Sequence, residues 1–370
     1  MKKIILKNVH GKLSLFAVLV AFISFLTSCD KDIADLNPDS SSTQGLEKSM
    51  HIHVSDPNLL VSGLQGSSGS AIGPDGALYV TEGAVGKISR INPRTGEITT
   101  FASGFPLSLI GIGGVYDVAF LGKTAYALVT LVDDPTLFPT GEVNGIYRVD
   151  GPDSVTVIAD IGTYNIKHPP TGFDFYVSTG VQYSIQTYHD GFLVTDGHLN
   201  RVLYVTRNGK ITEFKTFDNI VPTGLAVSGN TVYMAEAGPT PHNPEDGKVV
   251  SFGLKSHRVK TVASGAPLLV DVEFGRGQTL FALSQGIWEG APEDAGTPAN
   301  PDTGSLVKVN SNGTFTTITE DLDRPTSLEI SGNTAYIITL TGEVWTVENI
   351  AGQPFGHDHW KSHQHGHNYR

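Results

Sequence analysis

The 370-residue sequence predicts an all-β fold, a six-bladed β-propeller whose ring is closed by the N-terminal strand completing the last blade. Three observations predict it: a four-strand unit recurs, a segment before the first unit supplies a missing strand, and insertions fall on one side of the units. The clearest unit covers residues 68–106, where short β-branched and aromatic runs alternate with turns such as GPDG and PRTG. Runs bounded by Gly, Pro, Asp and Asn are typical of antiparallel strands.

The unit recurs six times at a spacing of roughly 45 to 65 residues, which is typical of propeller blades. The second strands of the six copies are ALYVTE (77–82), TAYALV (124–129), GFLVTD (191–196), TVYMAE (231–236), TLFALS (279–284) and TAYIIT (334–339). Only five copies carry a fourth strand, and residues 58–63 supply the sixth. We therefore expect the N-terminal strand to complete the last blade, which leaves no open sheet edge.

The long connections are expected on a single rim of the ring. In a blade with strands a to d, the b–c and d–a connections emerge on one rim and the a–b and c–d turns on the other. All a–b and c–d turns here are short, whereas 132–144, 237–247 and 286–304 are long b–c loops and 161–178 is a long d–a loop. Long loops on one face of a rigid scaffold favour a recognition role for that face.

Residues 1–28 have the pattern of a lipoprotein signal peptide. Four lysines flank the start of the 14-residue apolar run 13–26, which is short for a membrane-spanning helix and typical of a signal-peptide core. The following LTSC (26–29) resembles a bacterial lipobox, and the resemblance implies cleavage before Cys29 and lipidation of that residue. A plain secretory signal with an incidental cysteine is the alternative.

The rest of the chain divides into three expected parts. Residues 29–57 are polar and acidic and are expected to form a flexible tether. Residues 58–350 are expected to form the propeller, and 351–370 a histidine-rich C-terminal tail. This organisation predicts an extracytoplasmic, membrane-anchored lipoprotein of the cell envelope, in either a periplasmic or a surface-facing location.

Composition and missing motifs exclude several functions. The net charge is −12, and no cluster of Lys and Arg follows the first dozen residues, which excludes a nucleic-acid partner. The sequence has no Gly-x-Ser-x-Gly, no His-Glu-x-x-His and no Walker A motif. Cys29 is the only cysteine, so thiol catalysis by the propeller is also excluded.

Several phrases of the repeat resemble the ScyD/ScyE family. They are GPDGALYVTEGAVGKISRINPRTGEITTFASG, GVYDVAFLGKTAYAL, NGIYRVD, VIADIGTYN and VPTGLAVSGNTVYMAE, and the resemblance covers about residues 60 to 345. It implies a six-bladed propeller without an established reaction. The phrase LVTDGHLNRVLYV (193–205) also resembles an NHL repeat, which belongs to a broader group of propellers.

Aligning the innermost strands gives one column of residues facing the central channel: Gly69, Asp117, Tyr183, Gly224, Asp271 and Ser327. Small residues are expected where six strands crowd an axis. Asp117 and Asp271 depart from this, and because they lie in blades two and five we expect them to face each other. With Glu273 or Tyr183 they are candidates for a Ca²⁺ site. Alternatively, each Asp accepts hydrogen bonds from the backbone of the adjacent blade.

Two other groups of residues are candidates. Glu82, Asp196 and Glu236 end the second strand in three blades, where they either cap the backbone of the following turn or border a pocket on the loop-rich rim. Five histidines crowd the C-terminal tail: His357, His359, His363, His365 and His367. Such a tail either binds Zn²⁺ or Ni²⁺ or is simply solvated, because its spacing matches no fixed zinc pattern.

Two functions fit the sequence. The first is a lipid-anchored binding or interaction module that takes a small-molecule or protein ligand on its loop-rich rim. The second is a metal-dependent hydrolase or lyase working at the channel mouth, similar in plan to the gluconolactonase and paraoxonase propellers. The number of channel oxygens that converge on one point discriminates between them, since three or more favour the enzyme.

Overall fold

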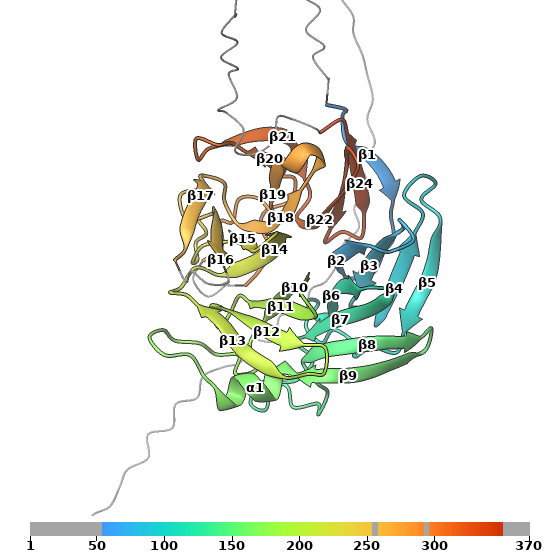
Figure 1. The fold of residues 1–370 in the computed structure, drawn as a ribbon, viewed down its shortest axis with the longest axis vertical. Coiled ribbons are helices and arrows are strands. Elements are labelled where there is room, and N and C mark those ends of the chain that lie inside the picture. Colours follow the sequence, from blue (N-terminus) through green and yellow to red (C-terminus); the bar gives the residue numbers. More distant parts are fainter. Residues whose placement is uncertain (1–53, 254–257, 292–295, 351–370) are drawn as a thin grey trace, which may run out of the picture. The chain divides into compact units, whose positions relative to one another are not determined.

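The computed structural model describes residues 54–253, 258–291 and 296–350, and these form a ring of six four-stranded antiparallel sheets around a central channel (Figure 1). This confirms the expected six-bladed propeller. Cys29, the signal peptide, most of the tether and the five tail histidines lie outside the described residues. No helix among the described residues is long and apolar enough to cross a membrane.

Each blade contains four strands that follow one another in the sheet, the first lining the channel. Blade 1 contains β2 (Ser67–Ile72), β3 (Leu78–Glu82), β4 (Lys87–Ile91) and β5 (Ile98–Ser103). Blade 2 contains β6 (Gly114–Leu121), β7 (Thr124–Thr130), β8 (Gly145–Gly151) and β9 (Ser154–Asp160). Blade 3 contains β10 (Gln182–Tyr188), β11 (Gly191–Asp196), β12 (Arg201–Thr206) and β13 (Ile211–Thr216).

The second half of the ring repeats the plan. Blade 4 contains β14 (Pro222–Ser228), β15 (Thr231–Glu236), β16 (Lys248–Gly253) and β17 (Lys260–Ser264). Blade 5 contains β18 (Leu269–Phe274), β19 (Leu280–Ser284), β20 (Gly304–Val309) and β21 (Phe315–Leu322). Blade 6 contains β22 (Pro325–Ser331), β23 (Thr334–Thr339), β24 (Val344–Glu348) and, from the other end of the chain, β1 (Asn58–Val61).

The strand β1 closes the ring, as the sequence predicts. It pairs antiparallel with β24, with Asn58 opposite Thr346 and Leu59 opposite Trp345. Figure 1 shows the blue N-terminal strand beside the red-brown end of the chain. The β24 edge is thereby paired within the ring instead of being exposed.

The hydrophobic core lies between the blades. Six clusters of buried apolar side chains each combine residues of two neighbouring blades, one cluster at every junction of the ring. Both faces of each sheet are therefore covered, and the second strands are mostly apolar because most or all of their residues are buried, as in β19.

The b–c and d–a connections form what we call the loop-rich rim, and the a–b and c–d turns form the short-turn rim. One d–a connection differs from the expectation of a plain loop, because it begins with the helix α1 (Ile161–Lys167). The Asp160 side chain caps this helix by accepting a hydrogen bond from the Thr163 amide at 2.8 Å. Ile161 and Asn165 are buried, so packing stabilises a helix too short to form alone.

Candidate functional site

The Asp117 carboxylate joins three blades around the channel. Its Oδ1 accepts a hydrogen bond from the Val118 amide, and its Oδ2 accepts one from Ile185 of blade 3, both at 2.8 Å. On the other side it packs against Gly69 of blade 1, where an added Cβ would lie 2.6 Å from the Asp117 Cα. Gly69 therefore makes room for the aspartate of the next blade.

Asp271 repeats this arrangement on the opposite side of the channel. Its carboxylate accepts hydrogen bonds from the amides of Val272 and, in blade 6, Leu328, both at 2.8 Å. Gly224 of blade 4 faces it, and an added Cβ there would lie 2.6 Å from the Asp271 Cα. The channel thus has a twofold pseudosymmetry, in which blades 1–3 and blades 4–6 build the same lock.

Strand pairing places Ser184 and not Tyr183 in the channel column of blade 3. Ile185 pairs with Val194, and the Ser184 amide bonds to the Thr195 hydroxyl, so Ser184 corresponds to Ser327 of blade 6. The pairing of β10 is irregular between Gln182 and Ile185, as it is at the same point of β2 and β14, so the pairing of Ile185 fixes the register and Tyr183 lies one residue before the channel column. The column therefore reads Gly, Asp, Ser twice around the ring.

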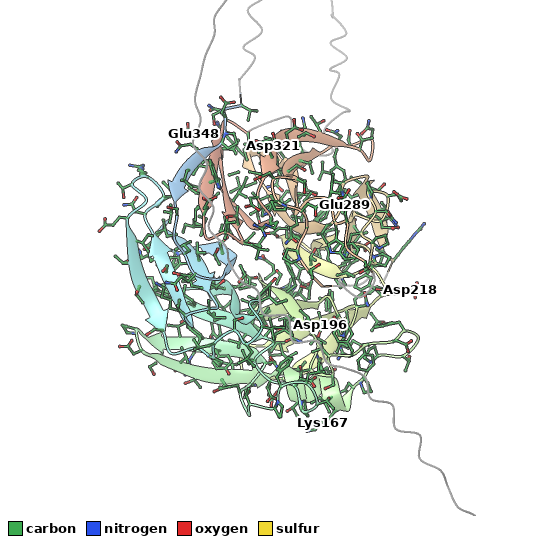
Figure 2. The ribbon with its side chains drawn as sticks, turned by 180° about the vertical axis from the view of Figure 1, so that it is seen from behind. Lys167, Asp196, Asp218, Glu289, Asp321 and Glu348 are labelled. Atoms are coloured by element: carbon green, nitrogen blue, oxygen red, sulfur yellow. The ribbon has the colours of Figure 1, made fainter. Side chains whose placement is uncertain are left out.

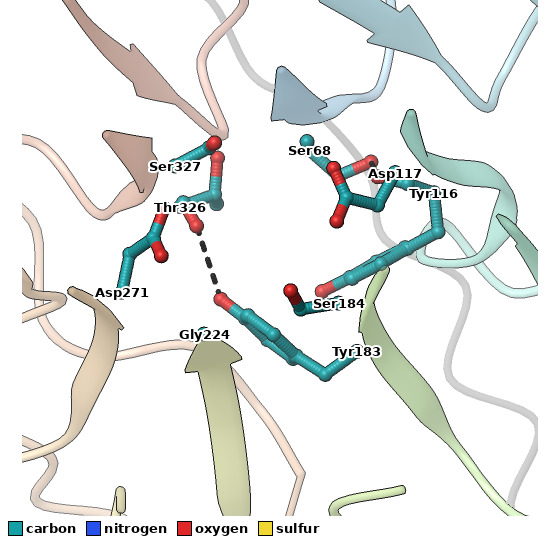
Figure 3. Close-up of a pocket in the computed structure, with 10 residues that line it drawn as sticks. Ser68, Tyr116, Asp117, Tyr183, Ser184, Gly224, Asp271, Thr326 and Ser327 are labelled. Atoms are coloured by element: carbon teal, nitrogen blue, oxygen red, sulfur yellow. Dashed lines mark hydrogen bonds between the residues drawn. The ribbon is translucent and has the colours of Figure 1, made fainter. Parts of the chain in front are cut away.

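Tyr183 crosses the channel instead. Its hydroxyl donates a hydrogen bond to the Thr326 carbonyl of the opposite blade at 3.2 Å, as Figure 3 shows. The ring of Tyr116 meets it edge to face, with ring centroids 5.4 Å apart. Only a small cavity of about 20 Å³ remains around these two rings, which is room for about one water molecule.

A larger acidic cavity lies on the short-turn side of the tyrosines. Its volume is about 250 Å³, and it is lined by the carboxyl groups of Asp117, Asp271, Glu273 and Glu329, with Gln186 and several small polar residues. No Lys or Arg lines it. Sequence alignment missed Glu329, although it lies two residues after Ser327 just as Glu273 lies two residues after Asp271.

Burial raises the pKa of all four carboxyl groups. It raises the pKa of Asp271 to about 7 and that of Glu273 to about 8. The pKa values of Asp117 and Glu329 also lie well above their usual range, chiefly through burial and, for Glu329, through the neighbouring carboxylates. The exposed part of these four side chains faces the narrow channel, so protein surrounds each carboxyl group on most sides. The raised pKa values favour the protonated form of these carboxyl groups near neutral pH.

These carboxyl groups do not converge on one point. Among the described residues, no group of three or more His, Cys, Asp and Glu lies close enough to hold a metal ion. The Ca²⁺ site stays a prediction, since such a site needs six to eight oxygen ligands at about 2.3–2.6 Å. The bonds of Asp117 and Asp271 to neighbouring blades agree with a structural role for both.

Glu82 and Asp196 are buried on the loop-rich rim, where both accept backbone hydrogen bonds. Glu82 accepts from the Gln65 amide at 2.8 Å and lies 3.3 Å from the Lys87 ammonium group. Asp196 accepts from the amides of Val181 and Leu199 and from the side-chain amides of two further residues, Asn165 and Gln182. Both carboxylates are thus occupied within the fold.

Glu236 lies at the same position in blade 4 but is differently placed. It is 4% exposed, and its carboxylate accepts no hydrogen bond from any described residue. The two amides that would reach it, those of Ile220 and Val221, instead bond to Asn200 of blade 3. Burial therefore raises the pKa of Glu236 to about 7, against the lowering effect of Lys248.

The loop-rich rim carries most of the exposed apolar side chains. Eleven large hydrophobic side chains are exposed among the described residues, and eight lie in connections of this rim: Val85, Leu107, Leu109, Ile110, Leu137, Ile166, Tyr176 and Ile287. The other three lie on outer strands. We call Val85, Leu107, Leu109, Ile110, Leu137 and Tyr176, from blades 1 to 3, the apolar rim patch.

Buried acceptors hold the loops that present this patch. Asp134 is fully buried and accepts from the Leu137 and Ser178 amides, which joins the b–c loop of blade 2 to the following d–a connection. These bonds lower the pKa of Asp134 to about 2 even though burial opposes them. The His198 Nε2 accepts the amides of Tyr176 and Val177 at 3.1 and 3.0 Å. Loops fixed in this way lose little entropy when they bind.

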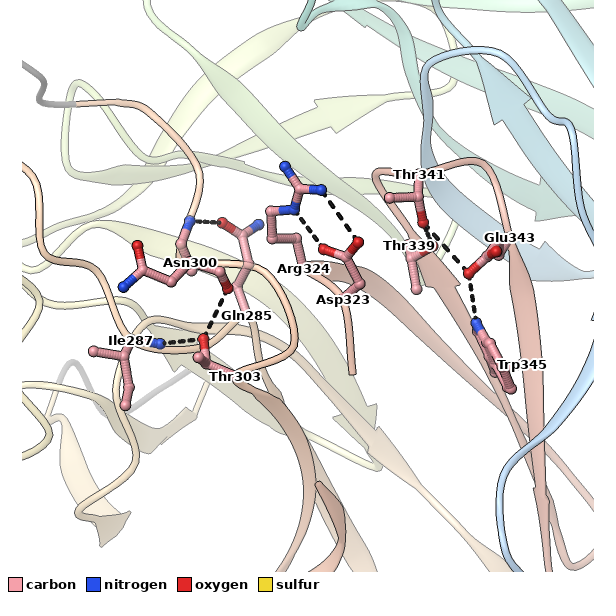
Figure 4. Close-up of polar contacts among 11 residues, drawn as sticks. Gln285, Ile287, Asn300, Thr303, Asp323, Arg324, Thr339, Thr341, Glu343 and Trp345 are labelled. Atoms are coloured by element: carbon pink, nitrogen blue, oxygen red, sulfur yellow. Dashed lines mark hydrogen bonds and ion pairs between the residues drawn. The ribbon is translucent and has the colours of Figure 1, made fainter. Parts of the chain in front are cut away.

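The loop of Ile287 in blade 5 is fixed in the same manner. The Ile287 amide bonds to the Thr303 hydroxyl at 2.9 Å, as Figure 4 shows, and the Asn300 amide donates a backbone hydrogen bond to the Ile287 carbonyl. The Gln285 side chain accepts the Ala299 amide at 3.1 Å. This long insertion therefore has a defined conformation where it is described.

The two rims differ in charge. The loop-rich rim exposes the acidic residues Glu142, Asp174, Asp218, Glu245, Glu289 and Asp302 in its described connections. Lys167 is the exposed basic residue there, and the partly buried Arg324 pairs with Asp323. Figure 2 labels Lys167, Asp218 and Glu289, which are spread around the ring from blade 2 to blade 5. The short-turn rim exposes residues of both signs, the basic Arg94, Lys123, Arg207, Lys210, Arg258 and Arg276 and the acidic Asp75, Glu97, Asp153 and Asp190.

No family model matches the chain, and no curated protein matches it. Among solved structures, a gluconolactonase from Xanthomonas campestris has 12% sequence identity and a TM-score of 0.55, covering 82% of this chain and 93% of that chain. The PQQ-bound aldose sugar dehydrogenase from Streptomyces coelicolor has 14% identity and a TM-score of 0.55, covering 79% and 98%. Virginiamycin B lyase from Staphylococcus aureus has 13% identity and a TM-score of 0.48, with the same coverage.

The chain is a six-bladed propeller. The gluconolactonase and the aldose sugar dehydrogenase, each with a TM-score of 0.55, support this fold. At 12–14% identity the likeness extends to the fold alone.

Proposed function

We propose that this protein is a lipid-anchored, extracytoplasmic interaction module, related to the ScyD/ScyE propellers, that binds a protein partner through its loop-rich rim. One observation carries the proposal: eight of the eleven exposed large hydrophobic side chains lie in the connections of this rim. Contiguous exposed apolar surface on a soluble domain marks an interaction site. The signal-like segment before Cys29 supports the anchor and the location outside the cytoplasm.

The rigidity of the rim supports the same proposal. Leu137 and Tyr176 project from loops whose backbones are held by Asp134 and His198. A loop that only connects strands needs no buried acceptor to hold an apolar side chain in solvent. Preorganised apolar side chains lower the entropy cost of binding and serve as anchors in protein interfaces.

A metal-dependent hydrolase or lyase working at the channel mouth is the second candidate. The acidic cavity of about 250 Å³ favours this enzyme, since four residues with carboxyl groups line one cavity. Solved propellers of similar fold include gluconolactonases, which fits this candidate at the level of the fold. We place it second because the carboxyl groups of the described residues form no three-ligand group.

Site-specific photo-crosslinking in the producing organism tests the first proposal. A photoreactive amino acid replaces Leu109, Ile110 or Tyr176 of the full-length protein, and matched controls carry it at Ile98 and Val157, which are exposed on outer strands. We expect one protein to be cross-linked from the rim positions and not from the controls. The purified partner should then bind the Leu109→Ser/Ile110→Ser variant at least tenfold more weakly, which corresponds to about 1.4 kcal/mol.

The opposite results are equally clear. Equal cross-linking from rim and control positions, or an unchanged affinity of the double variant, would contradict binding through this rim. Isothermal titration of the tail-truncated protein with Ca²⁺ tests the second candidate. Stoichiometric Ca²⁺ binding that Asp117→Asn abolishes would favour the channel enzyme.

A further inference from the structure

We infer that the partner of the loop-rich rim presents a protein segment that combines apolar side chains with Lys or Arg. This inference rests on the proposed function and adds the chemistry of the partner to it. It depends on three features of the described residues: the bonds between the loops that carry the apolar rim patch, the acidic residues around the patch, and the outward direction of its side chains.

The loops of the apolar rim patch are bonded to one another in two pairs. The Ser108 amide bonds to the Gly83 carbonyl at 2.9 Å, which joins the loop of Leu107, Leu109 and Ile110 to the turn of Val85. Asp134 bonds to Ser178, which joins the loop of Leu137 to the connection that carries Tyr176. The apolar side chains are therefore presented by two fixed pairs of loops on the same rim, between blades 1 and 2 and between blades 2 and 3.

Apart from Lys167 at the end of α1, the exposed charge beside this surface is negative. Glu142 follows Leu137 in the same loop, and Asp174 precedes Tyr176 in the next connection. Neither carboxylate accepts a hydrogen bond from a described residue, so both are available to a partner. Asp133 and Asp134, in contrast, are occupied by backbone amides of their own loop. Across the rest of the rim, Glu245, Glu289 and Asp302 extend the negative field.

A partner that fits this rim needs complementary charge. Opposite potentials across an interface accelerate association and disfavour partners of like charge. An anionic lipid surface would be repelled by these carboxylates, because its surface potential is also negative. A protein segment with basic residues on either side of apolar ones matches both the exposed apolar side chains and the acidic residues of the rim.

The direction of the side chains favours a protein over a small molecule. Leu107, Ile110 and Tyr176 are 53%, 56% and 64% exposed, so they project outward from the rim. Small-molecule sites enclose most of the ligand surface in a concave pocket. Projecting anchors of this kind instead insert between the side chains of a broad partner surface.

A display selection with random peptides tests the inference without knowledge of the natural partner. The full-length protein is the bait, and the Leu109→Ser/Ile110→Ser variant is the matched control. A second variant, Glu142→Gln/Asp174→Asn, removes the two available charges and keeps the shape. We expect peptides that bind the wild-type protein and not the first variant, and that are enriched in both apolar residues and Lys or Arg. Their affinity should fall about threefold to tenfold in the charge variant and at high salt.

Each result has a defined meaning. Rim-dependent peptides that are neutral or acidic would overturn the inferred chemistry and leave the proposed function intact. The absence of any rim-dependent peptide, together with the absence of rim-specific cross-links, would overturn both. Rim-dependent binding to vesicles rich in anionic lipid would show that the occupant is a lipid surface. Thermal unfolding of each variant checks that the fold is retained.

Discussion

At the scale of single residues, two aspartates organise the channel. Asp117 and Asp271 each bond to the next blade and pack against a glycine of the previous one. Each carboxylate thereby satisfies two amides that face a narrow channel, where unsatisfied backbone groups are costly. Removing either side chain breaks the link between three blades.

We predict that Asp117→Ala and Asp271→Ala each lower the free energy of unfolding by about 2–4 kcal/mol, because two backbone amides lose their acceptor. Urea denaturation measures this. Asp174→Ala is the control, since its carboxylate has no partner among the described residues, and it should change stability by less than about 0.5 kcal/mol. Equal effects of all three substitutions would contradict the linking role of Asp117 and Asp271 between blades.

Glu273 is expected to make the fold less stable as the pH rises. Its pKa is raised by burial to about 8, so the folded state holds a proton that the unfolded state has lost. The stabilisation is complete below the unfolded pKa of about 4.5 and is lost as the pH rises through about 8.

Glu273→Gln should therefore stabilise the protein at about pH 8 by roughly 1–2 kcal/mol, a value reduced for exposure to channel water, and should change little at about pH 4. Denaturation at both pH values checks this. A Glu97→Gln variant, altered at an exposed turn, should show no such dependence. A stability difference that is the same at both pH values would contradict the protonated state.

At the scale of elements, the loops of the rim and the closing strand are the parts that most affect function. The loop of Tyr176 depends on His198, whose Nε2 must be unprotonated to accept two amides. Burial lowers the pKa of His198, while Asp196 and Asp134 oppose this. The neutral form is thus favoured in the fold, and its contribution is present above the unfolded pKa of about 6.5 and is lost as the pH falls through the lower pKa of the folded state.

Acidification is therefore expected to release the Tyr176 loop before the propeller unfolds. Amide hydrogen exchange at Tyr176 and Val177, corrected for the intrinsic rate, should show less protection at about pH 5 than at about pH 8. The Leu137 amide is the internal control, because Asp134 has a pKa of about 2 and keeps its charge across this range. Equal loss of protection at all three amides would argue against His198 as the cause.

The strand β1 acts as the latch of the ring. We predict that a chain starting at residue 63 unfolds at a lower temperature and self-associates, because the β24 edge is left without its partner. A chain starting at residue 54 retains the strand and is the control. Thermal unfolding and sedimentation velocity measure the two effects. Identical behaviour of both chains would show that closure by β1 is dispensable.

At the scale of the whole molecule, the two rims have different chemistry. One rim is apolar and mostly acidic with rigid loops, and the other exposes both basic and acidic residues on short turns. The acidic cavity lies on the short-turn side of Tyr116 and Tyr183, so it is separated from the loop-rich rim by two aromatic rings. The channel and the apolar rim patch are therefore two separate surfaces.

This separation predicts that the rim contributes to binding and not to stability. Leu109→Ser and Ile110→Ser should change the free energy of unfolding by less than about 0.5 kcal/mol, because both side chains are already exposed. Leu128→Ala, at a fully buried position, is the matched control and should cost about 2–5 kcal/mol. Chemical denaturation compares them. A large loss in the rim variants would mean that these side chains support the fold.

Much of the fold was predictable because it depends on local patterns. Alternation, turn residues and repeat spacing identify each strand, and the count of strands requires that residues 58–61 close the ring. The pair Asp117 and Asp271 followed from the same alignment. The choice between Tyr183 and Ser184 did not, because this part of β10 contains neither the glycine nor the aspartate that marks the channel position in blades 1, 2, 4 and 5.

The sequence by itself determined the blade number, the closing strand and the rim that carries the long loops, since these depend on residue types that repeat along the chain. Only the tertiary structure decided which polar groups have hydrogen-bond partners and which apolar side chains are exposed to solvent. Asp196 accepts four hydrogen bonds, whereas Glu236 at the same position accepts none from a described residue. The amides of Ile220 and Val221 beside Glu236 bond to Asn200 of the neighbouring blade instead. Burial and partnership are properties of residues distant in the chain, and no single stretch of sequence contains them.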